Sequence, residues 1–360
     1  MNGGPVAARF EVPYLQLLDA DGQLTGPLPP LADNPDEWLA MYRMMVRARV
    51  FDAKAVNLQR TGKLGTYPSC LGQEAVHVGV GAALLPDDVM FTVYREIGAK
   101  FWRGVTMRDI LLYWGGDERG TNYVNTPQDF PFCVPIGSQM PQAAGAALAF
   151  QLRSESRCAL GFIGDGGTSQ GAFYEAINFA GARGLPLVTM VVNNQYAISA
   201  PVRVQTACET LAQKGIAAGM RSLQIDGNDP LAVRVAVGEA AMRARRGDGP
   251  TLIEALTYRL SDHTTSDDAT RYRDASEVAA ARAREPLIRM RRLLESRALW
   301  NEELENGLRA ECAAEVDEAV RQYLATPRQH VDTMFEHVLA RMPRGLEAQR
   351  EEARRFSGRR

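Results

Sequence analysis

Two polar residues that could bind a small cation stand close behind two apolar runs of the chain. Asp165 follows the run 158–163, and Asn194 follows the run 187–192. Each run is typical of a buried strand, and residues 168–182 between them show helical periodicity. Because parallel strands joined through a helix end at one edge of a sheet, we expect the two side chains to converge there. A carboxylate and an amide oxygen so placed would suit Mg²⁺, which usually keeps phosphate oxygens and water in its shell.

Glycines surround the first of these positions. Gly164, Gly166 and Gly167 flank Asp165, and their lack of a side chain lets a ligand approach the backbone. We expect the following helix to open with free N–H groups at Gly167 and the next two residues, and a helix start attracts phosphate. The predicted ligand is therefore a magnesium–diphosphate. A glycine turn that only packs a strand against a helix is the alternative for this turn taken alone, which carries neither a GxGxxG nor a GK[ST] motif.

Two further candidates lie beyond the ends of other predicted strands. Arg95 ends the short strand 89–93 and could clamp a phosphate, because a guanidinium can donate to two oxygens at once. A surface ion pair is the alternative for this arginine. His263, one of four histidines in the chain, lies in the loop 259–273. The order of the strands returns that loop to the diphosphate side, whereas an ordinary solvated histidine is the alternative.

Loops elsewhere in the chain could complete a pocket. Tyr67 and Gln73, in the segment 65–74, are either pocket residues or surface-loop residues. The turn 134–139 would present carbonyls and small side chains to a ligand, although close packing of the small-residue helix that follows explains it equally well. The polar segment 115–131 is expected to line the entrance of the site.

Composition narrows the classes of protein that the chain could represent. Its 360 residues, 46% of them hydrophobic, can bury a sizeable core, and a net charge of −2 gives no reason to expect nucleic acid as a partner. Five cysteines without a CxxC spacing indicate reduced thiols. The start of the chain lacks a secretory pattern, and no apolar run reaches membrane-spanning length. We therefore expect a soluble cytoplasmic protein with no membrane partner.

The chain divides into four predicted segments. Residues 1–35 form an arm, which is either a floppy terminus or a segment laid on a partner. Residues 36–275 form one large α/β domain with a mostly parallel sheet flanked by helices. Residues 276–345 form a helical C-terminal extension, and residues 346–360 form a polar tail.

The motifs together resemble one family. They are the segment TSQGAFYEAINFAG, the pair Tyr94-Arg95, the turn PIGSQMPQAAGAA and the loop HTTSDDATRYR. The chain resembles, over roughly residues 10–345, the alpha subunits of the thiamin diphosphate-dependent first component of 2-oxo acid dehydrogenase complexes. The first motif is most similar to pyruvate-type bacterial subunits, and the last would suit branched-chain enzymes equally well. The resemblance implies a thiamin diphosphate-binding fold.

The resemblance also implies roles for individual residues. Asp165 and Asn194 would bind Mg²⁺ through their side chains, and Tyr196 would do so through its carbonyl. Ile136 would make backbone contacts to the aminopyrimidine ring, and Ile198 would wedge the cofactor into a bent shape. The residues implied to contact thiamin diphosphate are Tyr94, Arg95, Ile136, Gly164, Asp165, Gly166, Gly167, Asn194, Tyr196, Ile198 and His263.

Other implied sites are a potassium-binding turn and an acyl pocket. Ser138 and Gln139 match a turn that binds K⁺ in some relatives, and Tyr67 would lie near the acyl pocket. Many relatives carry an aromatic residue at the position of Thr66, which leaves the size of that pocket open. Thr264 stands where animal relatives carry a phosphorylated serine, and we predict no regulation there.

One absence predicts the quaternary structure. The sequence contains no segment that matches the pyrimidine-binding half of the family, which in split relatives belongs to a beta subunit. The resemblance therefore implies an α2β2 heterotetramer that oxidatively decarboxylates pyruvate and transfers the acetyl unit to a lipoyl domain, with His263 as the general acid–base for that transfer. Branched-chain 2-oxo acid dehydrogenase and acetoin dehydrogenase are the alternatives within the class. A non-catalytic nucleotide-binding module is the alternative outside it.

Overall fold

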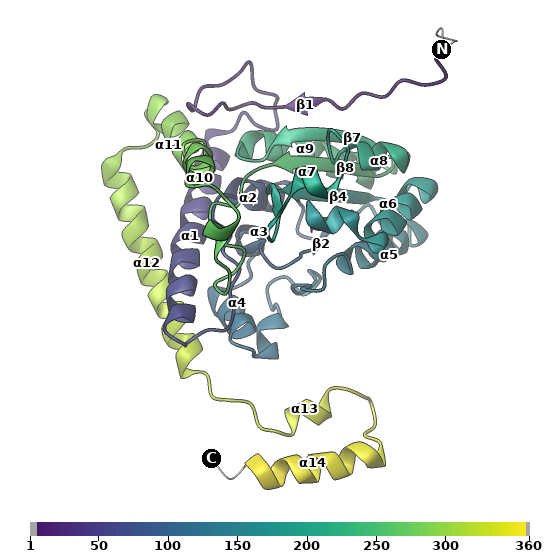
Figure 1. The fold of residues 1–360 in the computed structure, drawn as a ribbon, viewed down its shortest axis with the longest axis vertical. Helices are drawn as coiled ribbons and strands as arrows, with labels where there is room; N and C mark the ends of the chain where they lie inside the picture. Colours follow the sequence, from purple (N-terminus) through teal and green to yellow (C-terminus); the bar gives the residue numbers. More distant parts are fainter. Residues whose placement is uncertain (1–5, 358–360) are drawn as a thin grey trace.

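One parallel sheet crosses the centre of the protein, with its strands in the order β1-β7-β8-β4-β3-β2 (Figure 1). The computed structural model describes residues 6–357. Every neighbouring pair of these strands is parallel, which confirms the predicted sheet type. The strands are β1 (Tyr14–Leu15), β2 (Val89–Phe91), β3 (Ala159–Gly164), β4 (Leu187–Asn193), β7 (Arg221–Asp226) and β8 (Thr251–Leu256).

The central strands β3 and β4 are mostly apolar because helices cover both faces of the sheet. All residues of β4 are buried, as are all of β3 except its last glycine. Such continuous apolar runs are typical of parallel sheets, whereas a half-exposed strand alternates apolar and polar residues. The sequence therefore predicted these two strands correctly, and each ends at the sheet edge where Asp165 and Asn194 follow.

Two pairs of helices sandwich the sheet. The helices α2 (Glu74–Ala83) and α9 (Pro230–Arg245) pack on one face, where Val76 and Val233 join the apolar cluster of the central strands. The helices α5 (Gln139–Leu152) and α6 (Gly171–Arg183) pack on the other face through a second cluster. This doubly covered arrangement confirms the predicted α/β fold.

A long N-terminal helix and a long C-terminal helix lie side by side against this core (Figure 1). They are α1 (Pro35–Arg60) and α12 (Glu302–Ala325), and α11 (Pro286–Ser296) precedes α12. Ion pairs join α1 to α12 along their exposed edges, including Lys54 to Asp317 at 2.6 Å. Apolar side chains of α1, α9, α11 and α12 form one cluster, so the predicted C-terminal extension is packed on the core at its start.

The remaining elements are short. The helices are α3 (Ile97–Trp102), α4 (Met107–Trp114), α7 (Val202–Gln205), α8 (Gln213–Ala217) and α10 (Ala275–Arg282), the strands are β5 (Tyr196–Ala197) and β6 (Ala200–Pro201), and the 3₁₀ turns are Glu118–Thr121, Gly166–Ser169 and Ala269–Arg271. Within residues 6–357, none of the helices has both the length and the apolar composition needed to span a membrane.

Part of the N-terminal segment packs on the protein's own core, whereas residues 6–11 are exposed (Figure 1). β1 adds to the sheet edge beside β7, and Leu17 and Leu18 are buried. The carboxylate of Asp229 accepts the backbone N–H groups of both leucines, at 2.6 and 2.7 Å. It also caps α9 by accepting two further backbone N–H groups at the start of that helix. Residues 1–5 lie outside the described residues.

The C-terminal end of the chain differs from the expected polar tail. Two helices, α13 (Thr333–Glu336) and α14 (Arg344–Ser357), lie apart from the sheet, and neither contains a buried residue (Figure 1). Arg354 of α14 donates to both oxygens of Asp332 before α13, at 2.7 and 2.8 Å. A helix therefore forms where the polar composition predicted none, and the division into four segments stays a prediction.

Replacement of Asp229 by alanine should release the N-terminal segment. The variant loses a helix cap and leaves the buried N–H groups of Leu17 and Leu18 without an acceptor, which should lower the free energy of unfolding by about 3 kcal/mol. Urea denaturation would measure this loss, and limited proteolysis should cut the segment earlier than in the wild type. Asn34→Ala, which removes only the exposed cap of α1, should cost about 1 kcal/mol. Equal effects of the two variants would contradict this role of Asp229.

Candidate active site

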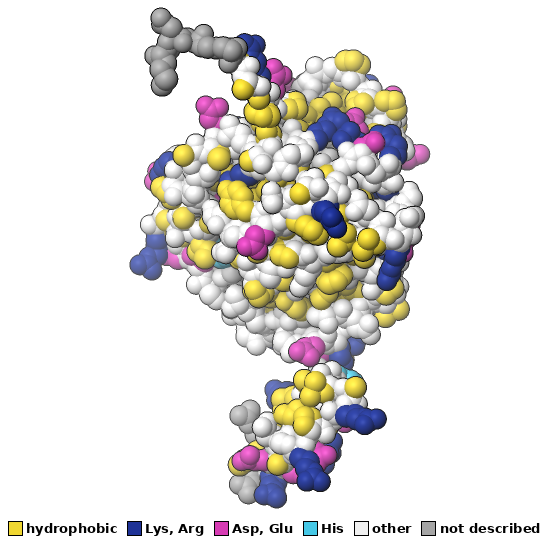
Figure 2. All heavy atoms as spheres, turned by 90° about the vertical axis from the view of Figure 1, so that its right-hand side faces the viewer, with side chains coloured by type: hydrophobic (Ala, Val, Ile, Leu, Met, Phe, Trp, Pro, Cys, Tyr) yellow, Lys and Arg dark blue, Asp and Glu magenta, His cyan; other side chains and the backbone are white. Residues whose placement is uncertain are grey.

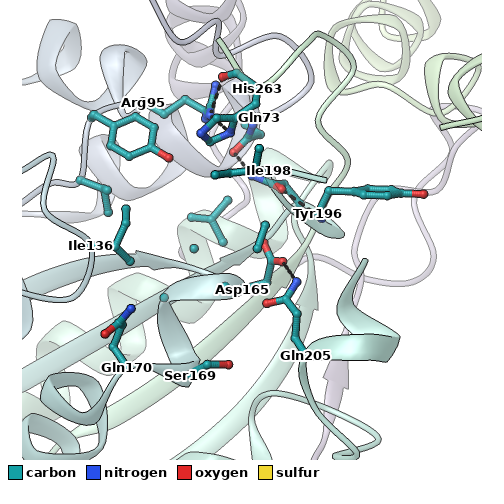
Figure 3. Close-up of a pocket in the computed structure, with 18 of the residues that line it drawn as sticks. Gln73, Arg95, Ile136, Asp165, Ser169, Gln170, Tyr196, Ile198, Gln205 and His263 are labelled. Carbon is teal, nitrogen blue, oxygen red and sulfur yellow. Dashed lines mark hydrogen bonds between the residues drawn. The ribbon is translucent and has the colours of Figure 1, made fainter. Parts of the chain in front are cut away.

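A cavity of about 520 Å³ opens at the carboxyl edge of the sheet, above β3 and β4 (Figure 3). All the residues predicted to contact a cofactor line it, although they come from segments spread over residues 94–263. Figure 3 shows Arg95 and His263 on one side of the cavity and Asp165 with Gln205 on the other. The lining residues are Gln73, Val93, Tyr94, Arg95, Glu96, Ile136, Gly164, Asp165, Gly166, Gly167, Ser169, Gln170, Val192, Asn194, Tyr196, Ala197, Ile198, Gln205 and His263.

Asp165 is a buried carboxylate without a cationic partner. Its side chain follows β3 and is 3% exposed, and burial raises its pKa. Oδ2 accepts a hydrogen bond of 2.9 Å from Gln205 Nε2, and no lysine or arginine in the described chain pairs with it. Asp165 is the one carboxylate among the predicted metal ligands, and residues 6–357 contain no group of three or more His, Cys, Asp or Glu side chains that could hold a metal. This donor set suits a cation that also binds ligand oxygens.

Asn194 brings amide atoms to the same side of the cavity. Its Oδ1 lies 3.4 Å from the N–H of Tyr196, and its Nδ2 lies 3.4 Å from Oε1 of Gln73. The carbonyl of Tyr196 accepts a hydrogen bond of 3.1 Å from Arg259 and keeps a second lone pair. The predicted metal ligands therefore line one cavity, and the residues present fit a magnesium ion. Their role as ligands stays a prediction.

The glycine turn leaves space on the cavity side and none on the protein side. A Cβ on Gly164 would meet no atom within 4 Å. A Cβ on Gly166 would lie 2.4 Å from Cβ of Ala197, and one on Gly167 would lie 2.5 Å from Cγ1 of Ile163. A side chain at Gly166 would therefore clash with Ala197 of β5, and one at Gly167 would clash with Ile163 of β3. The absence of side chains therefore keeps the backbone close to the cavity, as a phosphate cradle requires.

The helix after this turn begins later than predicted. Residues Gly166–Ser169 form a 3₁₀ turn, and α6 starts only at Gly171. The N–H of Thr168 donates to the carbonyl of Asp165 at 3.1 Å, so the expectation that it is free is wrong. The tighter 3₁₀ turn satisfies a donor that an α-helix would leave open in its first turn.

Two buried guanidinium groups lie near the cavity and form no ion pair with a carboxylate among the described residues: Arg95 lines the cavity, and Arg259 lies behind two lining residues. Arg95 is 4% exposed and donates to the carbonyls of Ser69 and His263, at 2.5 and 3.1 Å. Arg259 is fully buried and donates to the carbonyls of Tyr196 and Ile198, at 3.1 and 2.8 Å. The alternative that Arg95 forms a surface ion pair is therefore wrong. Buried positive charge without a counterion makes this side of the cavity a site for an anion.

His263 is a neutral imidazole in this environment. Burial, followed by the charges of Arg95 and Arg259, lowers its pKa to about 3. Its Nδ1 lies 3.3 Å from a nitrogen of Arg95 and 3.4 Å from one of Arg259, so Nδ1 is the acceptor and Nε2 carries the hydrogen. The side chain is half-buried at the cavity, which excludes the alternative of an ordinary solvated histidine. An anion in the cavity would raise its pKa by offsetting the two positive charges.

A hydrogen-bond network holds the loop that carries His263. The backbone N–H of His263 donates to Asp267 at 2.8 Å, and the hydroxyl of Tyr272 donates to the same carboxylate. Arg259 donates to the Tyr272 oxygen at 2.8 Å. Thr264 is half-buried beside this network and lines a neighbouring cavity.

Ile198 adopts a backbone conformation that β-branched residues rarely occupy. Its φ is 55°, and its side chain is 55% exposed above the cavity. Such a conformation costs about 1–3 kcal/mol and persists only where the surroundings impose it. The hydrogen bond from buried Arg259 to the Ile198 carbonyl supplies that constraint. This strain is typical of residues that shape a ligand site.

Three predicted site residues lie outside the lining of the cavity. Tyr67 is fully buried and instead lines the neighbouring cavity of about 380 Å³. Ser138 donates to the carbonyl of Pro135 at 2.6 Å, and Gln139 donates to the carbonyl of Phe162 at 2.7 Å. Oε1 of Gln139 is buried without a hydrogen-bond partner, as an atom reserved for a ligand would be.

Sequence reasoning missed several residues of this site. Arg259 belongs to the predicted loop 259–273 without a predicted role, and Gln205 is not among the predicted site residues, yet they donate hydrogen bonds to the Tyr196 carbonyl and the Asp165 carboxylate, respectively. Lys214 was likewise missed, although its buried ammonium donates to the hydroxyl and carbonyl of Thr168 at 2.8 and 3.0 Å. Gln73 was an open candidate; it is 2% exposed and lines the cavity with an unpartnered Nε2. No local sequence pattern identifies Arg259, Gln205 or Lys214, because each donates hydrogen bonds to a residue far away in the sequence.

Comparison with known proteins gives the class. Residues 42–332 match the family described as Dehydrogenase E1 component. The alpha subunit of 3-methyl-2-oxobutanoate dehydrogenase from Mycobacterium tuberculosis is 43% identical over 341 residues, which cover 94% of this chain and 93% of the relative. The chain belongs to the dehydrogenase E1 component family.

The relatives also identify the kind of subunit. The alpha subunit of the pyruvate dehydrogenase E1 component from Staphylococcus aureus is 39% identical over 347 residues, covering 96% of this chain and 93% of the relative. The corresponding subunit from Bacillus subtilis is 39% identical over 337 residues, covering 93% and 90%. These matches confirm the resemblance to alpha subunits of 2-oxo acid dehydrogenases.

Arg95→Ala should raise the pKa of His263 toward its ordinary value of 6.5, because one of the two neighbouring positive charges is removed. Since the wild-type imidazole stays neutral when folded but binds a proton when unfolded, His263 destabilises the fold as pH falls from about 6.5 toward 3. NMR titration of the histidine ring signals should show this shift. Arg43→Ala, in an exposed ion pair with Glu311, should leave it unchanged. An unaltered His263 titration in Arg95→Ala would contradict the described electrostatics.

Proposed function

We propose that the chain is the alpha subunit of a pyruvate dehydrogenase (acetyl-transferring) that binds thiamin diphosphate and Mg²⁺ in the cavity. One observation carries the proposal: the buried carboxylate of Asp165, without a cationic partner among the described residues, lines the same cavity as the buried guanidinium group of Arg95, and Arg259 is buried behind the carbonyls of Tyr196 and Ile198. A metal ion offsets the carboxylate, and a diphosphate offsets the arginines. Family membership supports the same cofactor.

The residues of this chain bind and orient the cofactor. Asp165, Asn194 and the Tyr196 carbonyl hold Mg²⁺, and the glycine turn directs N–H groups toward the diphosphate. Tyr94 and Arg95 contact the diphosphate from the opposite side, and Ile136 and Ile198 shape the space for the rings. The thiazolium ring of the bound cofactor supplies the electron sink for decarboxylation of a 2-oxo acid.

His263 moves the proton in the transfer of the acetyl unit to the lipoyl group. The Nε2–H of the neutral imidazole is free to donate, since Nδ1 accepts from the two arginines. A bound diphosphate raises the pKa from about 3 by partly offsetting those arginines, so the imidazole can exchange protons closer to neutral pH. His263 is thus the catalytic residue of this chain.

Two further sites belong to the proposal. Ser138 and Gln139 bind K⁺, and support comes from the unpartnered Oε1 of Gln139 beside the Ser138–Pro135 turn. Tyr67 belongs to the acyl pocket that forms when the partner chain is present, and its buried position behind Arg95 supports an indirect contribution.

The active enzyme is an α2β2 heterotetramer in which a beta subunit completes the site. Ile136 and Ile198 are partly exposed at the cavity, and a Cβ on Gly145 of α5 would meet no atom within 4 Å. Figure 2 shows hydrophobic side chains spread over the face that includes α5 and α6, and Leu152 and Phe179 are exposed on these helices. These apolar surfaces support burial by a partner chain. The lipoyl domain of the acyltransferase component is the second partner, and a cytoplasmic location with no nucleic-acid or membrane partner stays part of the proposal.

A second candidate substrate is 3-methyl-2-oxobutanoate. The Mycobacterium tuberculosis relative named for it is 43% identical to this chain, against 39% for the pyruvate dehydrogenase subunits. The hydroxyl of Thr66 lies 3.1 Å from that of Ser266, and Thr66 does not line the cavity of this chain. Acetoin is a further alternative within the class. Turnover of pyruvate, 3-methyl-2-oxobutanoate and acetoin by the assembled enzyme decides among them, and pyruvate is the expected preferred substrate.

Asp165→Ala should abolish magnesium-dependent cofactor binding and leave the fold intact. Loss of a residue that only supports a metal ligand typically weakens metal binding about 10–100-fold, so loss of the sole carboxylate ligand should cost at least about 100-fold. Calorimetry on the assembled enzyme would measure the affinity for thiamin diphosphate with Mg²⁺. Glu175→Gln, an exposed carboxyl change on α6, should keep wild-type affinity. Unchanged affinity in Asp165→Ala, or preferential binding of ATP or NAD by the wild type, would contradict the proposal.

The purified chain alone should not decarboxylate 2-oxo acids. It lacks the pyrimidine-binding half of the site, so the cofactor cannot be activated on this subunit. Co-expression with a beta-type partner should restore activity and yield a heterotetramer by light scattering. Robust turnover by the isolated chain would refute the divided site.

A further inference from the structure

A buried carboxylate on α1 organises a segment next to the cavity. Asp52 is 3% exposed, and its Oδ1 accepts the Tyr67 hydroxyl at 3.0 Å and the Cys70 N–H at 2.8 Å. Its Oδ2 accepts the Ser69 hydroxyl at 2.5 Å. No ion pair involves Asp52 in residues 6–357, so these three donors compensate the buried group. One rigid helical position therefore anchors the whole segment 67–70.

The segment 67–70 contacts both Arg95 and the loop that carries His263. The carbonyl of Ser69 accepts Nη1 of Arg95 at 2.5 Å. The backbone of Tyr67 pairs with Thr265, since the Tyr67 N–H donates to the Thr265 hydroxyl at 3.0 Å and the Thr265 N–H donates to the Tyr67 carbonyl at 2.9 Å. Thr265 lies in the loop that carries His263. Asp52 itself does not line the cavity of the active site.

We propose that Asp52 is a positioning residue that acts through the segment 67–70 to orient Arg95 and the His263 loop for cofactor binding. A carboxylate suits this position because all three neighbours donate to it and it needs no donor of its own. Arg95 can place its second nitrogen, Nη2, near the His263 ring only while the Ser69 carbonyl holds Nη1. The inference rests on the proposed function, because it assigns Asp52 a part in binding the proposed cofactor.

A matched control exists at the opposite edge of the sheet. Asp88 is also fully buried and accepts hydrogen bonds from the N–H groups of Leu85 and Cys158 at 2.8 and 2.9 Å, but unlike Asp52 it also forms an ion pair with Arg245, so its replacement is the more disruptive of the two changes. It stands before β2 and β3, at the amino ends of the strands and away from the cavity. Asp88→Asn therefore perturbs a buried carboxylate of similar burial without touching the segment 67–70.

The test compares Asp52→Asn with Asp88→Asn in the enzyme assembled with its beta partner. Asp52→Asn should weaken binding of thiamin diphosphate with Mg²⁺ about tenfold by calorimetry, the effect of losing one hydrogen bond to a charged group. In the cofactor-free enzyme, hydrogen exchange of residues 261–268 should be faster in Asp52→Asn alone. In an Arg95→Ala background, Asp52→Asn should cause no further loss of affinity, because Asp52 is proposed to affect cofactor binding by orienting Arg95.

Three outcomes separate this inference from its alternatives. Unchanged affinity and unchanged exchange of residues 261–268 in Asp52→Asn would overturn it, as would the same tenfold loss in the Arg95→Ala background. A wild-type enzyme that fails to bind the cofactor would refute the proposed function, whereas the exchange measurement would still test the link from Asp52 to the loop. If Asp52→Asn does not assemble, Ser69→Ala removes one donor to Asp52 but keeps the carbonyl that binds Arg95. Its affinity and exchange should change in the same direction, and wild-type values would overturn the inference.

Discussion

Buried charges without charged partners are the constraint on which the site depends. Asp165 and Arg95 line opposite sides of the cavity, and Arg259 is buried behind the carbonyls of Tyr196 and Ile198. Removing each such charge from water costs several kcal/mol even after the protein relaxes. The fold offsets part of this cost with neutral dipoles: backbone carbonyls face the arginines, and the Gln205 amide faces Asp165. The cavity therefore keeps a negative charge at Asp165 and a positive charge at Arg95. A metal ion bound to a diphosphate would match these two charges, with the cation next to Asp165 and the anion next to Arg95.

A buried carboxylate in the sheet, Glu254, is also compensated by hydrogen bonds from neutral groups. Glu254 lies 1% exposed in the middle of β8 and accepts the Asn193 side chain at 2.8 Å and the Ala212 N–H at 3.1 Å. Its hydrogen bonds fix the end of β4, from which the chain turns to present Asn194. Burying a charged residue such as Glu254 in a central strand costs free energy. Its hydrogen bond to Asn193 shows what this cost achieves, because it holds the residue next to Asn194 in place.

The cavity is held rigidly on the side of Asp165 and the glycine turn and is open on the side of Ile136 and Ile198. Rigid strands and the 3₁₀ turn hold Asp165 and the glycines, whereas Ile136 and Ile198 project with large exposed fractions of 42% and 55%. An apolar rim around a charged floor is the expected half of a site that a second chain covers. The chain belongs to the dehydrogenase E1 component family. Its sequence identities to the 3-methyl-2-oxobutanoate and pyruvate dehydrogenase subunits, 43% and 39%, are too similar to distinguish the acyl group of the substrate.

The sequence by itself determined the parallel sheet and the residues at its carboxyl edge. The runs that became β3 and β4 are apolar because helices bury both of their faces, and the topology of a strand–helix–strand unit then brings Asp165 and Asn194 together. Only the tertiary structure decided that Arg259, Gln205, Lys214 and Asp52 belong to the site's support, that Thr168 has no free N–H, and that the N-terminal segment joins the core. Local periodicity reports which face of an element is buried, but a hydrogen bond between segments far apart in the chain leaves no periodic trace. Such bonds are set by how the packed helices and strands place their ends in space.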